Sequence, residues 1–147
     1  MQMQQNQDTD LLQDVYRGAS IGERGARLML EKSRDGGLSA KLSGFADEYT
    51  TIKQEAANQL SSYGEAPRQT TALENSAQWL GIQLETLADK TPAHMAEMLM
   101  TGNTQSMIRD IESIKRNHNT KQQTRELAGR LVRLENDSFN AMKTYLS

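Results

Sequence analysis

The feature that most constrains the fold is the scarcity of helix-breaking residues. Only two prolines, Pro67 and Pro92, occur among 147 residues, and the plainest turn signal is the cluster Asp35-Gly36-Gly37. No stretch alternates apolar and polar residues with a period of two, and aromatic residues make up 5% of the chain, so strands are not expected. The sequence therefore predicts an all-α fold built from long helices.

Between these breaks, apolar residues recur every three or four positions, as on the buried face of a helix. This pattern predicts long helices over residues 10–34, 38–63, 92–118 and 120–146, and a shorter helix over residues 71–89. Each pair of long helices is joined by a short turn, so each pair should form an antiparallel hairpin. We expect residues 10–147 to be a single domain, a four-helix bundle with a long helical crossover between its second and third helices. Residues 1–9 are expected to form a flexible polar leader.

Local signals predict several helix ends. Gly64 suits the left-handed position that closes the second helix, and Thr91 followed by Pro92 is typical of a helix start. Thr120 is the expected cap of the last helix. The third long helix is expected to break near residues 101–103. Its predicted buried stripe consists of Met95, Met98, Leu99, Gly102, Met107, Ile108, Ile111, Ile114 and His118.

The shorter helix carries more apolar surface than one contact face requires. Its main stripe is Leu73, Ala77, Leu80, Leu84 and Leu87. Trp79 and Ile82 lie away from that stripe. We expect this helix to lie across the bundle, with Trp79 either folded under a loop or placed in a subunit contact. A homo-oligomer formed through Trp79 and Ile82 is the partner that this surface predicts.

Composition excludes several classes of function. The formal net charge is -2 with both signs interspersed, so no basic stripe is available for nucleic acid. The chain has no cysteine, which removes disulfides, thiolate nucleophiles and thiolate metal sites. No stretch approaches the length of a membrane span, and the first residues do not form a secretory signal. These features predict a cytoplasmic protein without membrane or nucleic-acid partners.

Four stretches carry a resemblance to a known family. They read LLQDVYRGASIGERGARLML, ADEYTTIKQEAANQLSSYGEAP, AQWLGIQLETL and LMTGNTQSMIRDIESIKRN, the last followed by LVRLENDSF. In order and spacing they are similar to an uncharacterised bacterial ferritin-like domain family. The resemblance covers nearly the whole chain and implies a ferritin-like four-helix bundle.

Ferritin-like iron proteins bind two metal ions with a glutamate from each of two helices and a Glu-x-x-His pair from each of the other two. This sequence departs from that pattern. A threonine stands three residues after both Asp47 and Glu48, and neither His94 nor His118 has a glutamate three residues before it. A two-iron centre is therefore not expected, and we predict no cofactor.

Some carboxylates nevertheless occupy unusual places. Glu23 and Glu135 stand on the apolar stripes of the first and last long helices, while Glu48 and Asp110 border those of the second and third. Three interpretations are open for them: a solvated flank paired with arginines, a hydrogen-bonded polar layer in the core, or a carboxylate site for iron or manganese. If a metal binds at all, its predicted ligands are Glu23, Glu48, Asp110 and Glu135.

Other candidate motifs have simpler interpretations. Methionines around His94 fit a core stripe better than a soft-metal site. Gly18, Gly22 and Gly25 fit close helix contact better than a phosphate loop. The expected function is therefore a non-catalytic structural or partner-binding bundle with a degraded metal site. The alternative is a carboxylate-based metal- or small-ligand-binding protein. The sequence does not predict an enzyme.

Overall fold

The computed structural model describes residues 2–69, 71–85, 89 and 91–147, and only the backbone of residues 72–74 and 77. This part of the chain is all-helical, as the sequence predicts. The helices are α1 (Gln2–Lys32), α2 (Gly36–Ser61), α3 (Thr71–Glu85), α4 (Pro92–Arg116) and α5 (Gln122–Met142), followed by a short 3-10 turn over Lys143–Tyr145.

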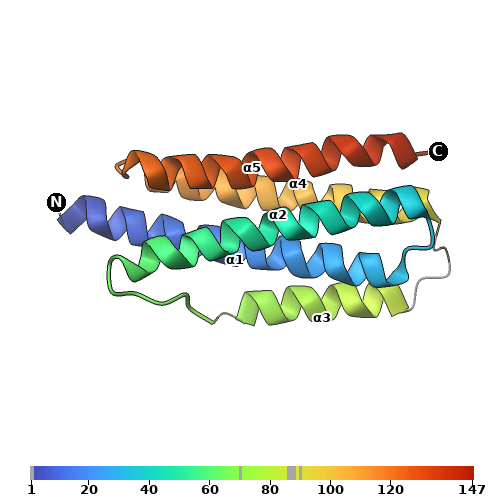
Figure 1. Ribbon diagram of the computed structural model, residues 1–147, viewed down its shortest axis with the longest axis horizontal. Helices are drawn as coiled ribbons and strands as arrows, with labels where there is room; N and C mark the ends of the chain where they lie inside the picture. The colour runs from blue at the N-terminus through green and yellow to red at the C-terminus, as the bar shows by residue number, and fades with distance from the viewer. Residues whose placement is uncertain (1, 70, 86–88, 90) are drawn as a thin grey trace.

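Two antiparallel hairpins form the body of the protein, α1 with α2 and α4 with α5 (Figure 1). The helix α1 also packs against α3, α4 and α5, so it is in contact with every other α-helix. Both α2 and α4 run in the same direction, so the connection between them returns along the length of the molecule (Figure 1). The described helices thus form two hairpins, and α3 lies in the connection between them (Figure 1).

The crossover helix α3 lies beside α1 and runs along it, not across the bundle as expected (Figure 1). Its stripe contributes Leu84, which is buried, and Leu80, which packs against the same core cluster. The predicted stripe members Leu73 and Ala77 have no described side chains, and residues 86–88 lie outside the described part of the chain.

Several helix ends follow the predicted local signals. The turn predicted at Asp35-Gly36-Gly37 lies earlier in the chain than expected, because α2 begins at Gly36 and Asp35 caps it: the Asp35 carboxylate accepts a hydrogen bond from the Leu38 amide at 2.8 Å. Gly64 has φ +74°, a backbone conformation that favours glycine. Thr91 caps α4, and Pro92 follows it in the first turn. In contrast, α4 continues without a break through residues 101–103.

The predicted leader is instead the first part of α1, which begins at Gln2. Asp8 is fully buried, and its two carboxylate oxygens accept hydrogen bonds from the Tyr63 hydroxyl at 2.7 Å and the Lys121 amide at 2.8 Å. The helix α5 begins one residue later than expected. Lys121 therefore occupies the capping position that was expected for Thr120. Polar residues that look like a solvated leader in the sequence attach α1 to the turn between α4 and α5.

The apolar core consists of two clusters. One lies near the first half of α1 and includes Leu12, Leu60 and Leu131, and the other lies near its end and includes Met29, Leu42 and Met95. No helix in the described part of the chain is both long and apolar enough to cross a membrane.

The buried face of α4 differs most from the prediction. After Ala96 this face is polar, with a spacing of three and four residues: Asn103, Ser106, Asp110, Ser113 and Asn117. Ile108 and Ile111, which were expected in the core, are 54% and 42% exposed. The helix is turned this way because its polar residues meet polar partners on neighbouring helices. Ser113 donates to Asp14, and Asn117 donates to Asp10 at 2.7 Å.

Candidate functional site: a cleft and a buried carboxyl pair

The four predicted metal ligands have three different environments. Glu48 is exposed on α2. Glu23 lies at the edge of the contact between α1 and α2, with 16% of its side chain exposed. Asp110 of α4 and Glu135 of α5 are buried and interact with each other. Two of the four carboxylates therefore meet, and the set does not converge on one point.

Glu23 is surrounded by donors. Its carboxylate accepts hydrogen bonds from the Thr50 hydroxyl and from Lys53 Nζ, the latter at 2.9 Å, and Arg27 lies 3.6 Å away. Burial alone would raise the pKa of this carboxyl, but the hydrogen bonds and the positive charges of Lys53 and Arg27 lower it below the usual value. Glu23 is therefore an ionised, paired group on the flank of the helix contact.

The Asp110–Glu135 pair has the opposite electrostatic environment. Glu135 is 1% exposed, and burial, the hydrogen bond with Asp110 and the charge of Asp110 raise its pKa well above the usual value. Asp110 Oδ2 and Glu135 Oε1 are buried without a donor when both groups are ionised. A proton on Glu135 supplies the missing donor, so Glu135 is the protonated member of the pair.

Burial also raises the pKa of Asp110, although its hydrogen bond with Glu135 and the charge of Arg109 act against that rise. Gly18 of α1 makes room for this carboxyl group, since a β-carbon at Gly18 would lie 3.1 Å from Asp110 Oδ1. Close approach of the helices at Gly18 thus brings α1 against the carboxyl pair. One polar layer of the core connects α1, α4 and α5 in this way.

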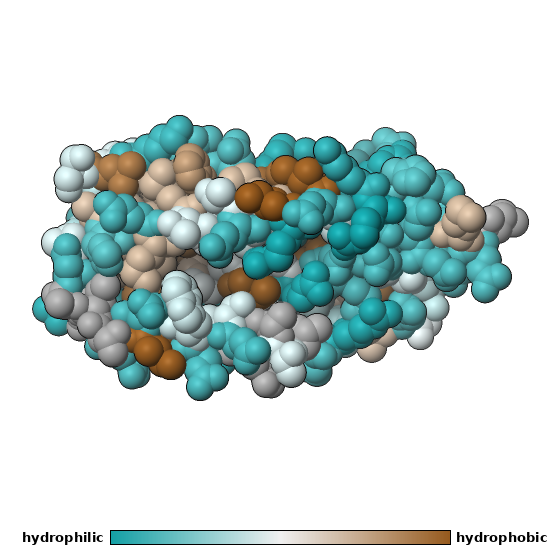
Figure 2. All heavy atoms as spheres, turned by 180° about the vertical axis from the view of Figure 1, so that it is seen from behind, coloured by the Kyte–Doolittle hydropathy of each residue, from teal (hydrophilic) through white to brown (hydrophobic). Residues whose placement is uncertain are grey.

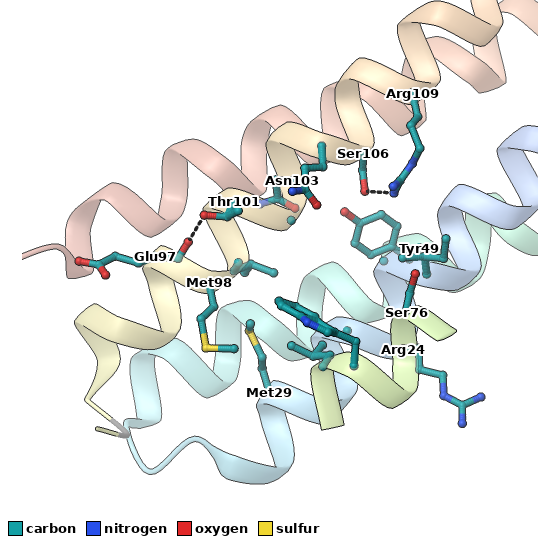
Figure 3. Close-up of a pocket in the computed structure, with 18 of the residues that line it drawn as sticks. Arg24, Met29, Tyr49, Ser76, Glu97, Met98, Thr101, Asn103, Ser106 and Arg109 are labelled. Atoms are coloured by element: carbon teal, nitrogen blue, oxygen red, sulfur yellow. Dashed lines mark hydrogen bonds between the residues drawn. The ribbon is translucent and has the colours of Figure 1, made fainter. Parts of the chain in front are cut away.

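Tyr49 of α2 completes this layer. Its ring fits against Gly22, where an added β-carbon would lie only 2.4 Å from ring atoms. Tyr49 is 3% exposed, and burial together with the charges of Glu135 and Asp110 raises the pKa of its hydroxyl well above the usual value. The hydroxyl makes no hydrogen bond to a described residue and points towards Ser106 of α4 (Figure 3).

A cleft of about 690 Å³ opens beside this layer, between α1, α3 and α4. The space-filling view of that face shows a hollow with apolar side chains at its base and hydrophilic ones around it (Figure 2). Met29 and Met98 lie at one end of the cleft, and Tyr49, Ser106 and Arg109 lie at the other (Figure 3). One end is therefore apolar and the other polar.

Missing side chains help to form the cleft. Gly22, Gly25 and Gly102 all line it. A β-carbon at Gly102 would meet nothing within 4 Å, so this position borders open space. Trp79 of α3 also lines the cleft and is 61% exposed, so it is not folded under a loop as one interpretation expected.

Sequence reasoning did not identify the cleft. Tyr49 is indistinguishable from other members of its helical stripe, and neither Ser106 nor Arg109 stands out by residue type. The polar spacing from Asn103 to Asn117 was the available signal, because five polar residues at three-four spacing mark a buried polar face. That signal was hidden by the isoleucines on the opposite side of the same helix.

The geometry gives limited support for a metal centre. In the described portion of the chain, no group of three or more histidine and carboxylate side chains is placed to hold a metal ion. Asp110 and Glu135 are two ligands on their own, and the pair shares a proton. His94 lies at the cleft, with Glu97 as its neighbour at 3.8 Å.

No family model matches this chain. The comparisons with curated proteins and with solved structures also found no match. The resemblance to a ferritin-like family therefore remains a prediction from the sequence.

Proposed function

We propose that this chain is a non-catalytic binding protein that holds a small, partly apolar molecule in the cleft between α1, α3 and α4. The observation that carries this proposal is Tyr49, a residue only 3% exposed that lines the cleft and whose hydroxyl makes no hydrogen bond to a described residue. A ligand in the cleft would supply a hydrogen-bond partner for this hydroxyl.

The size and character of the cleft support the proposal. Its volume of about 690 Å³ lies within the range of small-molecule sites, which are mostly apolar with a few placed polar groups. The methionines at one end adapt to varied apolar shapes. The close packing of α1 against Tyr49 at Gly22 holds the polar end in position before any ligand arrives.

The cleft can be tested by filling it. Gly102→Leu places a side chain in open space, while Gly44→Leu makes the same change on the exposed face of α2, where a β-carbon also meets nothing within 4 Å. Decan-1-ol is the probe, and Trp79 is the reporter because it is the only tryptophan and lines the cleft. We expect saturable changes in tryptophan emission for the natural chain and the Gly44→Leu variant, and a loss of binding for Gly102→Leu. Absence of saturable binding to the natural chain, both of decan-1-ol and of charged molecules of the same chain length, would overturn the proposal.

We also propose a relationship to ferritin-like proteins. One support is the parallel course of α2 and α4 with a crossover between two hairpins (Figure 1). The other is the meeting of the carboxyl groups of Asp110 and Glu135, from α4 and α5, in the core. Homo-oligomerisation through Trp79 and Ile82 stays a prediction, for which sedimentation of the natural chain and of Trp79→Ser is the test.

The second candidate is a carboxylate metal site, favoured only by the contact between Asp110 and Glu135. Metal analysis of protein purified without chelator and then loaded with iron or manganese tests it. Stoichiometric metal that is lost on Glu135→Gln would support a metal-binding protein. Absence of metal would leave the pair as a structural layer.

A further inference from the structure

The charges at the polar end of the cleft bear on which ligand it accepts. Arg109 of α4 and Arg24 of α1 both line the cleft, and neither forms a salt bridge with a described residue. Other arginines of the same two helices are paired, such as Arg27 with Glu23 and Arg116 with Asp14. The cleft therefore has two guanidinium groups without a paired carboxylate.

Arg109 reaches over the polar end. Its guanidinium donates a hydrogen bond to Ser106 Oγ at 3.2 Å, which places it on the side of α4 that Tyr49 faces (Figure 3). Arg24 extends away from Tyr49 at the rim, where its charge adds to the positive potential (Figure 3). Among the described residues that line the cleft, the only carboxylate is that of Glu97, near His94 at the other end.

The buried pair reduces this positive charge only in part. The proton on Glu135 leaves at most one negative charge on the pair, and Arg17 as well as Arg109 acts on Asp110. Asp14 adds a further negative charge nearby, but it is paired with Arg17 at 2.9 Å and with Arg116 at 3.2 Å. The polar end thus retains donors and positive charge that face the cleft.

We infer that the ligand is an elongated organic anion, with a carboxylate head bound by Arg109 and the Tyr49 hydroxyl and an apolar body lying towards Met29 and Met98. This inference rests on the proposed function and specifies its ligand. Guanidinium is the side chain best suited to carboxylate, since its two parallel donors match the two oxygens. From Arg109 to Met98, α4 rises roughly 16 Å at about 1.5 Å per residue, which matches an extended ligand.

Three probes of equal chain length separate charge from apolar contact: decanoate, decan-1-ol and decylammonium. Each is titrated below its micellar range into the full chain, with Trp79 emission as the readout. We expect decanoate to bind at least tenfold more tightly than decan-1-ol, and decylammonium more weakly than either. Raising the salt concentration should weaken decanoate binding and leave decan-1-ol binding unchanged.

Matched variants assign the effect to Arg109. Arg109→Gln should weaken decanoate binding at least tenfold without changing decan-1-ol binding. Arg109→Lys should weaken decanoate binding by a smaller factor. Lys115→Gln removes one positive charge from an exposed position of the same helix outside the cleft, and should leave both affinities unchanged.

The two proposals fail in different ways. If decan-1-ol binds as tightly as decanoate and Arg109→Gln changes neither affinity, the anion inference is wrong and the binding function stands. If none of the three probes binds to the natural chain, the proposed function itself is wrong. Circular dichroism of each variant confirms that its helices are intact.

Discussion

Glu23 and Glu135 look alike in the sequence and have opposite environments in the structure. Both stand on an apolar stripe near the middle of a long helix. Glu23 lies at the edge of α1 and α2 among Thr50, Lys53 and Arg27, and these partners favour its ionised form. Glu135 lies in the core against another acid, and that environment favours its protonated form. The position of a carboxylate on a stripe therefore does not determine its charge, because its partners come from other helices.

The difference also shows which packing environment, among those that the sequence left open, each of the two glutamates occupies. Glu23 is the paired flank, and Glu135 belongs to a hydrogen-bonded polar layer. Each environment makes a distinct contribution to the free energy of unfolding. The contribution of Glu135 is lost as the pH rises, and that of Glu23 is lost as the pH falls. Substitutions in each of the two environments test this difference.

The largest expected effect is from Glu135→Gln, which keeps a hydrogen-bond donor for Asp110 and removes the titratable group. Because the folded pKa of Glu135 is raised, its stability contribution is complete below about pH 4.5 and is lost as the pH rises towards the folded value. Holding the proton at pH 7 costs about 3 kcal/mol at about 1.4 kcal/mol per pH unit. The variant should gain about that much unfolding free energy at pH 7 and little at pH 4, measured by chemical denaturation. Equal gains at both pH values would contradict the raised pKa.

A somewhat smaller effect is expected from Gly22→Ala. The added β-carbon would meet the Tyr49 ring at 2.4 Å, so α1 or the ring must move, and overpacking of this kind costs about 2 kcal/mol. Gly44→Ala is the control, because its β-carbon meets nothing within 4 Å and alanine favours helix by up to about 1 kcal/mol. Thermal unfolding of both variants measures the difference. If Gly22→Ala proves as stable as Gly44→Ala, the close approach of α1 to Tyr49 is absent.

The smallest effect is expected from Glu23→Gln. The folded pKa of Glu23 is lowered, so its contribution is present above about pH 4.5 and is lost as the pH falls through the folded value. Partly exposed ion pairs contribute about 0.5 to 1 kcal/mol, so the variant should lose that much at pH 7 and less at pH 3. Glu48→Gln on the exposed surface of α2 serves as the reference and should change the unfolding free energy by less than about 0.5 kcal/mol. A loss for Glu23→Gln that persists at pH 3 would show that the carboxylate charge is not its cause.

The sequence predicts the parts of this fold that depend on local signals. Asp35, Gly64 and Thr91 act through their immediate neighbours, so the helix ends at these residues are readable. The orientation of α4 is not local. Its face with Ile108 and Ile111 is as periodic as its face with Asn103 and Asp110, and only partners on α1 and α5 decide which one is buried.

The cleft could not be predicted from the sequence, for a similar reason. It exists because α3 packs against α1 and leaves space beside α4, bordered by Gly102 and Trp79. Glycines in the sequence indicate close contact or open space equally well, and the structure contains both. Gly22 lies against the Tyr49 ring, whereas Gly102 faces open space.

The most direct test of the contrast between the two glutamates is a titration of the side-chain carboxyl groups by carbon-13 NMR. We expect the Glu135 signal to stay at its protonated position from pH 5 to pH 8, and the Glu23 signal to be that of an ionised group throughout this range. A Glu135 signal that titrates near the ordinary glutamate value of about 4.3 would contradict the protonated pair, because the core would then hold two charges and no shared proton.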